Sequence, residues 1–123
     1  TAKYKAKDYS HVLFTVGKQD YKRVGNGLLD FDGHCSFSPD QKWLVTDTYP
    51  TGRLREQKIY LLNMKTQATL CLGNFFEPDE FSAGAQQVWR CDLHCRWSPK
   101  GDIIGFSSTH SGSRQVYIFR LTF

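Results

Sequence analysis

A short motif occurs twice in this chain and constrains its fold more than any other feature. Residues 33–40 read GHCSFSPD and residues 93–100 read LHCRWSPK, with His, Cys, Ser and Pro at the same places and an aromatic residue before each Ser-Pro. Each copy is followed by a turn and then by an apolar stretch, WLVT at 43–46 and IIGF at 103–106. This matching order indicates an internal repeat, which is typical of architectures built from stacked units.

The repeated units predict antiparallel strands joined by short turns. Apolar stretches alternate with turn residues along the chain, and no helical periodicity occurs. Units of four antiparallel strands repeated around an axis form the blades of a β-propeller. We therefore predict an all-β fold, a partial β-propeller of about two to three blades. The expected strands cover residues 11–16, 21–24, 34–38, 43–48, 57–62, 68–73, 93–97, 102–108 and 114–120. The residues expected to pack between the blades are Phe37, Trp43, Leu61, Trp97, Ile104 and Tyr117.

The number of units predicts how the chain is organised. We expect residues 1–123 to form one unit with a partial blade at 1–29, a blade at 30–80 and a blade lacking its last strand at 90–123. Propellers close with about four or more blades, because each blade buries its faces only against its neighbours. The chain is therefore expected to be the C-terminal part of a longer propeller, or to complete the ring with another copy of itself. Alone, it should associate or be unstable, because open blade faces expose apolar surface.

Composition and charge exclude several classes of protein. Hydrophobic residues make up 40% of the 123 residues and aromatic residues 15%, as in globular domains. The net charge of +4 is scattered and no nucleic-acid motif occurs, so we expect no nucleic-acid partner. No apolar run approaches the length of a membrane span, so no membrane insertion is expected. Four cysteines, too sparsely spaced for a structural zinc site, are expected to be free core thiols of a cytoplasmic protein: Cys35, Cys71, Cys91 and Cys95.

The Ser-Pro strings resemble a known propeller repeat. FSPD at 37–40 before a Trp-led strand and WSPKG at 97–101 before an Ile-led strand are similar to the WD40-like repeats of the TolB type. The longer strings at 33–50 and 89–94 resemble the C-terminal blades of oligogalacturonate lyase-type propellers. The resemblance extends over roughly residues 30–123.

The lyase resemblance implies a metal-assisted enzyme that acts on short uronate oligosaccharides. In that family several histidines and a glutamine hold a divalent cation, usually manganese, and a separate histidine removes a proton. His34 and His94 match two of the metal-ligand histidines. Asp92 stands where the family has a further histidine, and Trp89 stands where it has the glutamine. The base histidine is expected upstream of Thr1.

The chemistry of uronate elimination explains why such residues are needed. The C5 proton is too weakly acidic to be removed unless the adjacent carboxylate is neutralised. A bound cation neutralises it as a Lewis acid, and an arginine can grip the same carboxylate through two hydrogen bonds. The candidates for binding the acidic oligosaccharide are Arg53, Arg55, Arg90 and Arg114.

Each candidate residue also has a purely structural interpretation. His34 and His94 recur with the repeat, so they are also explained as residues that pack within their own blades. Asp92 fits a turn-capping carboxylate, and Arg90 fits a partner in a salt bridge at the rim. The alternative functions are a non-catalytic relative of the lyases and a TolB-like propeller that serves as a protein-interaction module. A lyase needs histidines that converge on the channel, whereas an interaction module needs only packed blades and a rim that faces its partner.

Overall fold

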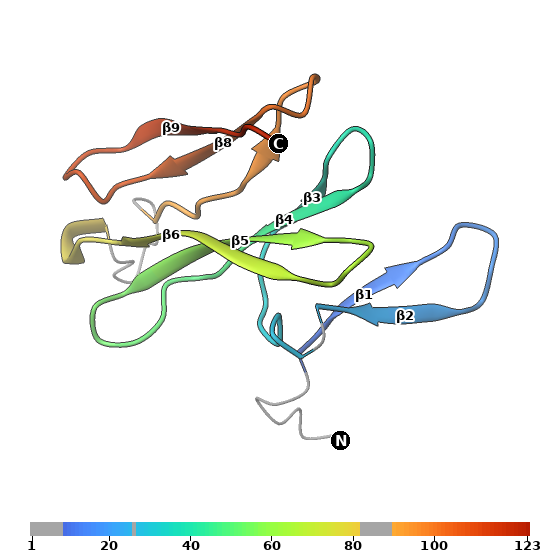
Figure 1. The fold of residues 1–123 in the computed structure, drawn as a ribbon. Coiled ribbons are helices and arrows are strands. Elements are labelled where there is room, and N and C mark those ends of the chain that lie inside the picture. Colours follow the sequence, from blue (N-terminus) through green and yellow to red (C-terminus); the bar gives the residue numbers. More distant parts are fainter. Residues whose placement is uncertain (1–8, 26, 82–89) are drawn as a thin grey trace, which may run out of the picture.

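The computed structural model describes residues 9–25, 27–81 and 90–123, whose strands form three antiparallel sheets (Figure 1). The hairpin sheet consists of β1 (His11–Phe14) and β2 (Tyr21–Val24). The four-stranded blade consists, in sheet order, of β3 (Cys35–Phe37), β4 (Trp43–Asp47), β5 (Glu56–Asn63) and β6 (Thr69–Phe76). The three-stranded blade consists of β7 (Arg96–Trp97), β8 (Ile103–Ser108) and β9 (Gln115–Arg120). A short 3-10 helix, η1 (Asp79–Phe81), follows β6. Strands dominate the described residues, so the predicted all-β fold class is confirmed.

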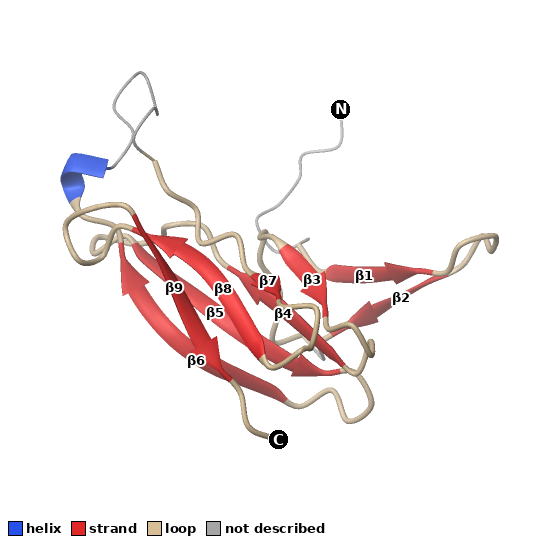
Figure 2. Cartoon of the chain, turned by 90° about the horizontal axis from the view of Figure 1, so that it is seen from above, coloured by secondary structure: helices blue, strands red, loops and turns tan. Residues whose placement is uncertain are grey.

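The two blades lie face to face. Figure 2 shows the three-stranded blade over the four-stranded blade, with β9 and β8 beside β6 and β5. The first strands of the two blades, β3 and β7, contact each other. Sheets that face one another and meet at their first strands have the radial arrangement of neighbouring propeller blades.

The repeated Ser-Pro motif forms the turn that joins the first two strands of each blade. The Ser38 hydroxyl donates to the Asp40 carboxylate at 2.7 Å and accepts from the Trp43 backbone N–H at 3.0 Å. In the second copy, the Ser98 hydroxyl donates to Asp102 at 2.9 Å and accepts from the Ile103 N–H at 3.1 Å. Serine in both motifs therefore satisfies backbone groups that the tight turn would leave unpaired.

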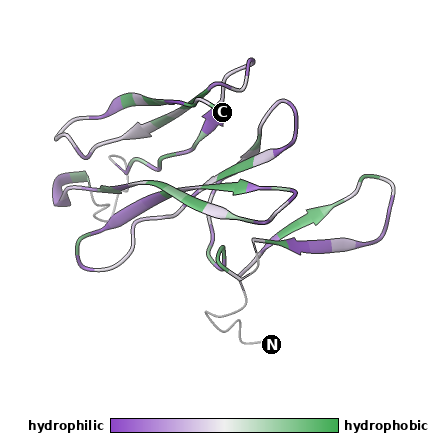
Figure 3. Ribbon diagram, viewed as in Figure 1, coloured by the Kyte–Doolittle hydropathy of each residue, from purple (hydrophilic) through white to green (hydrophobic). Residues whose placement is uncertain are grey.

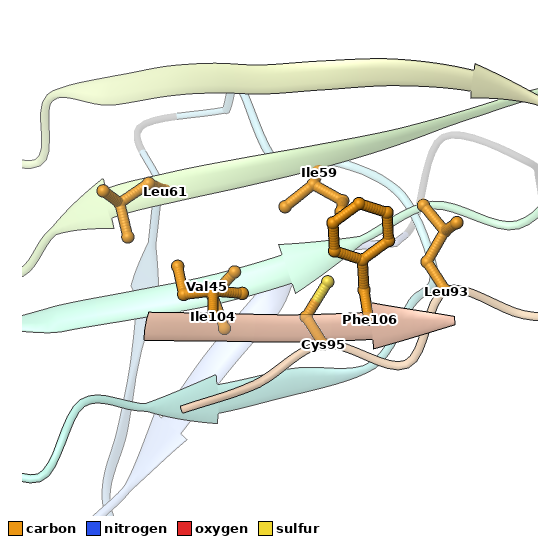
Figure 4. Packing of buried hydrophobic residues seen from close by; sticks show 7 residues of the cluster. All are labelled: Val45, Ile59, Leu61, Leu93, Cys95, Ile104 and Phe106. Atoms are coloured by element: carbon orange, nitrogen blue, oxygen red, sulfur yellow. The ribbon is translucent and has the colours of Figure 1, made fainter. Parts of the chain in front are cut away.

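Alternating apolar residues of the two blades form the larger core (Figure 4). Val45, Ile59 and Leu61 of the four-stranded blade pack against residues of the three-stranded blade, and each fully buried side chain contributes about 1.5–3 kcal/mol to stability. The residues from the three-stranded blade are Leu93, Cys95, Ile104 and Phe106. The prediction that Phe37 packs in a core is wrong, because its side chain is 39% exposed. The other predicted packing residues lie in or against this core: Trp43, Leu61, Trp97, Ile104 and Tyr117.

The hairpin sheet covers part of the opposite face of the four-stranded blade. Val24 and Leu29 pack there against Leu44 and Leu62. His11 fixes the hairpin sheet, since its two ring nitrogens lie 2.9 Å from the Leu29 carbonyl and 3.0 Å from the Thr46 hydroxyl. Figure 3 shows that β1 is largely apolar and β2 largely polar.

None of the described residues form a helix long and apolar enough to cross a membrane. All four cysteines are free, as expected, but only Cys91 and Cys95 are buried. The prediction of core thiols is therefore wrong for Cys35 and Cys71, which are exposed.

Candidate functional site at the junction of two blades

A buried aspartate lies where the two blades meet. Asp47 ends β4, and its side chain is 1% exposed. The carboxylate accepts hydrogen bonds from the backbone N–H of His34 at 2.7 Å, from the backbone N–H of His94 at 2.5 Å and from Nδ1 of His34 at 3.1 Å. Gly33 allows this approach, because a Cβ at that position would lie 1.8 Å from the Asp47 carbonyl oxygen. One carboxylate thus connects the histidines of both motif copies.

The two histidines begin a row of rings and charges along this junction. Their imidazole rings stack with centroids 3.9 Å apart and planes inclined by 18°. Tyr49 meets the His34 ring edge to face at 5.3 Å, and the guanidinium carbon of Arg90 lies 4.9 Å from the Tyr49 ring centroid. Arg90 Nε donates to the Asp92 carboxylate at 2.9 Å. We call this row the junction site, and it comprises His34, Asp47, Tyr49, Arg90, Asp92 and His94.

The electrostatic environment keeps the Tyr49 hydroxyl protonated. Burial is the main effect that raises the pKa of Tyr49, and the Asp32 and Asp92 carboxylates raise it further. The Arg90 guanidinium opposes them but does not reverse the shift. Tyr49 therefore offers the site a neutral hydroxyl and an aromatic face at physiological pH.

The three predicted metal ligands come together, but their donor atoms do not form a metal site. Nδ1 of His34 already bonds to Asp47, and the stacked rings of His34 and His94 place their nitrogen lone pairs in nearly parallel planes. The Asp92 carboxylate pairs with Arg90. No group of three or more His, Cys, Asp or Glu among the described residues is arranged to hold a metal ion. These residues do not fit manganese by themselves, and manganese binding stays a prediction that requires ligands from outside the described residues.

The four predicted arginines have different environments. Arg114 Nη2 donates to the Arg90 carbonyl at 2.8 Å, so these two arginines are neighbours. Arg55 instead pairs with the buried carboxylate of Glu77. Arg53 is exposed in the connection between β4 and β5, and no ion pair joins it to any described residue. Arg90 is the arginine that the structure places in the junction site.

Sequence reasoning missed the residue that organises the site. Asp47 is not part of the repeated motif, although a carboxylate at the end of a buried strand is itself a signal of a polar partner. His110 follows the second strand of its unit as Tyr49 does, but it lies outside the junction site: its Nδ1 lies 2.7 Å from the Ser108 hydroxyl and its ring packs on Tyr117. Trp89 lies outside the described residues.

Comparison with known proteins supports the fold. No protein-family model and no curated protein sequence matches the chain. The crystal structure of TolB from Acinetobacter baumannii matches 93% of this chain with a TM-score of 0.63 and 21% sequence identity. The chain has a TolB-type β-propeller fold. It spans 26% of that TolB chain, so the likeness concerns only part of the TolB structure.

Proposed function

We propose that this chain contributes part of a carbohydrate-active β-propeller, which binds acidic oligosaccharides at the junction site and cleaves them by β-elimination. The observation that carries the proposal is the hydrogen bond between the buried Asp47 carboxylate and Nδ1 of His34, next to Arg90. Three residues from the two motif copies and the segment before the second copy thereby meet in one row with Tyr49: His34, Arg90 and His94.

His34 is the proton acceptor in this proposal. Because Asp47 accepts the Nδ1 proton, Nε2 carries the lone pair, and the carboxylate stabilises the imidazolium that forms after proton transfer. The His34 side chain is 25% exposed, so a substrate can reach it. Its role differs from the metal-ligand role that the lyase resemblance implies.

Arg90 supplies the positive charge for the uronate carboxylate. Its side chain is 31% exposed, and Asp92 and the Tyr49 ring hold it in place. A guanidinium bonded in two places to a carboxylate stabilises the negative charge that develops when C5 loses its proton. The electron pair from the C5–H bond then forms the C4–C5 double bond, and the C4–O bond breaks with its electrons leaving on the oxygen.

An assay of the unsaturated product tests this function. The full chain is incubated with galacturonate oligosaccharides, and the conjugated C4–C5 double bond is followed by its ultraviolet absorbance. We expect product with the wild type and a rate lower by about a hundredfold or more in His34→Gln, because general base catalysis contributes that much. His110→Gln is the matched control, since His110 bonds within its own loop, and it should keep the wild-type rate. Absence of product with the wild type would contradict the proposal.

An interaction module is the second candidate function. The likeness to TolB and the exposed apolar side chains of β9 favour it, since Val116 is 68% and Ile118 58% exposed. Exposed apolar surface of this kind fits a polypeptide partner, either the remainder of a propeller or another copy of the chain. A chain that makes no product but associates in sedimentation would support this second function over the first.

A further inference from the structure

The segment that presents Arg90, Asp92 and His94 lies outside the strands, because β7 begins at Arg96. Its burial alternates: Cys91 and Leu93 are buried, whereas the three site residues are partly or fully exposed. A segment without strand partners must satisfy its backbone groups in another way if it is to hold a fixed position.

Two buried side chains of the four-stranded blade hold this segment at one residue. Glu77 Oε1 accepts the Cys91 backbone N–H at 3.1 Å. Gln57 Nε2 donates to the Cys91 carbonyl at 3.1 Å. Gln57 is 0% and Glu77 1% exposed, so water does not compete for these bonds. We call Gln57 and Glu77 the clamp, because together they bind both backbone polar groups of Cys91.

The clamp is itself fixed within the four-stranded blade. Arg55 pairs with the second carboxylate oxygen of Glu77, and the Glu77 backbone N–H donates to the Arg55 carbonyl at 2.9 Å. Two residues beyond Cys91, the Leu93 carbonyl accepts from the Ser107 N–H at 2.9 Å. The segment is therefore held at Cys91 by Gln57 and Glu77 and at Leu93 by β8 of the three-stranded blade.

The polar atoms of this region are not all satisfied. Gln57 Oε1 and Arg55 Nε are buried and have no hydrogen-bond partner within residues 9–25, 27–81 and 90–123. Such atoms destabilise a fold, and apolar residues of similar volume pack an interface without that cost. This polar arrangement stabilises the fold less than apolar packing would, but it fixes the Cys91 backbone in one place. We take that fixed position to be what the arrangement provides.

We infer that Gln57 and Glu77 are positioning residues, which set where Arg90, Asp92 and His94 lie relative to His34. This inference rests on the proposed function for its effect on substrate. Neither clamp residue touches the substrate or the His34 and Asp47 pair. Loss of the clamp should therefore weaken binding of the acidic oligosaccharide and also slow proton removal, because Arg90 stabilises the charge that develops at C5.

The test uses the full chain with four substitutions and measures KM, kcat and melting temperature for galacturonate oligosaccharides. Gln57→Leu and Glu77→Leu each remove one bond to Cys91, and we expect KM to rise and kcat to fall, with kcat/KM lower by about tenfold or more. Glu77→Gln keeps an oxygen that accepts the Cys91 N–H, so KM should stay near the wild-type value even if the melting temperature falls. Leu62→Ala is the stability control, because Leu62 is buried on the opposite face of the same blade.

Two results would overturn the inference: a wild-type KM in Gln57→Leu, or an equal rise of KM in Leu62→Ala. A second measurement does not depend on activity. Amide NMR signals of Arg90, Asp92 and His94 should shift in Gln57→Leu and stay in place in Leu62→Ala. An inactive wild type would contradict the proposed function alone. Unchanged amide signals in Gln57→Leu would contradict the role of the clamp, whether or not the wild type is active.

Discussion

The two copies of the Ser-Pro motif share His, Cys, Ser and Pro at the same positions but have different surroundings. Cys95 is 4% exposed, whereas Cys35 at the same motif position is exposed. The Trp97 indole donates to the Ser36 carbonyl at 3.1 Å, whereas Phe37, its counterpart, is 39% exposed. The second copy faces the four-stranded blade, and the first faces a pocket of about 250 Å³ beside the hairpin sheet. The inner strand of the three-stranded blade is thus covered by the blade before it, whereas β3 stays partly open, so the motif's own sequence does not determine its burial.

The two copies also differ in what their histidines contact. Ser107 follows His94 at the same spacing as Asp47 follows His34. Its backbone N–H, however, donates to the Leu93 carbonyl, whereas that of Asp47 donates to the His34 carbonyl. His34 gains a buried carboxylate on Nδ1, but His94 gives that carboxylate only its backbone N–H. One acidic residue at the end of β4 therefore makes the junction asymmetric and gives the two histidines separate roles.

The largest effect should come from removing this carboxylate. Asp47→Ala breaks three hydrogen bonds to a buried charge and should lower the free energy of unfolding by about 4 kcal/mol. Ser107→Ala should cost less than about 0.5 kcal/mol, since that position lacks such bonds. Urea denaturation of both variants checks the contrast, and equal losses would show that the two junction sides are equivalent.

The paired aromatic residues should give the next largest difference. Trp97→Ala removes a ring that packs against the larger core and should cost about 3 kcal/mol, whereas Phe37→Ala should cost less than about 1 kcal/mol. Both values are measured by urea denaturation. Similar costs would mean that Phe37 is covered in solution, for example by a second copy of the chain.

Thiol labelling compares the exposure of the cysteine side chains in the two motif copies and requires no substitution. In the folded chain Cys71 should react first, Cys35 more slowly and Cys95 only after unfolding, as followed by mass spectrometry. Burial and, second to it, the Asp47 carboxylate raise the pKa of Cys35 and Cys95, so fewer thiolates form. Because its pKa is raised, neutral Cys95 stabilises the fold fully below the ordinary thiol pKa of 9.0, and that stability is lost as the pH rises above it. Rapid labelling of Cys95 at neutral pH would contradict the buried position.

The smallest expected effect is that of manganese. A ligand that binds only the folded state raises the melting temperature by mass action. Because the stacked histidines do not converge on one point, manganese should leave the melting temperature of this chain unchanged. A rise that disappears in His34→Ala would restore His34 as a metal ligand.

The repeat predicts most strands of the two blades well because it aligns them twice. The strand expected at 93–97 is the exception, since only Arg96–Trp97 forms a strand and the residues before it are held by single hydrogen bonds instead. His34, His94, Arg90 and Asp92 could also be found as candidates, since they lie in or beside the motif copies. Two features could not be predicted. The exposure of Cys35 depends on a neighbouring sheet, and the contact between Glu77 and Cys91 joins residues of different blades through side-chain hydrogen bonds that leave no periodic pattern.

NMR titration of the imidazole signals shows whether the junction site recognises an acidic oligosaccharide. Trigalacturonate should shift the signals of His34 and His94 and leave those of His11 and His110 in place. The methyl-esterified sugar should cause no shift, because it lacks the carboxylates that Arg90 binds, and Arg90→Gln should abolish the response. Equal shifts with the acidic and esterified sugars, or shifts confined to His11 and His110, would contradict this recognition.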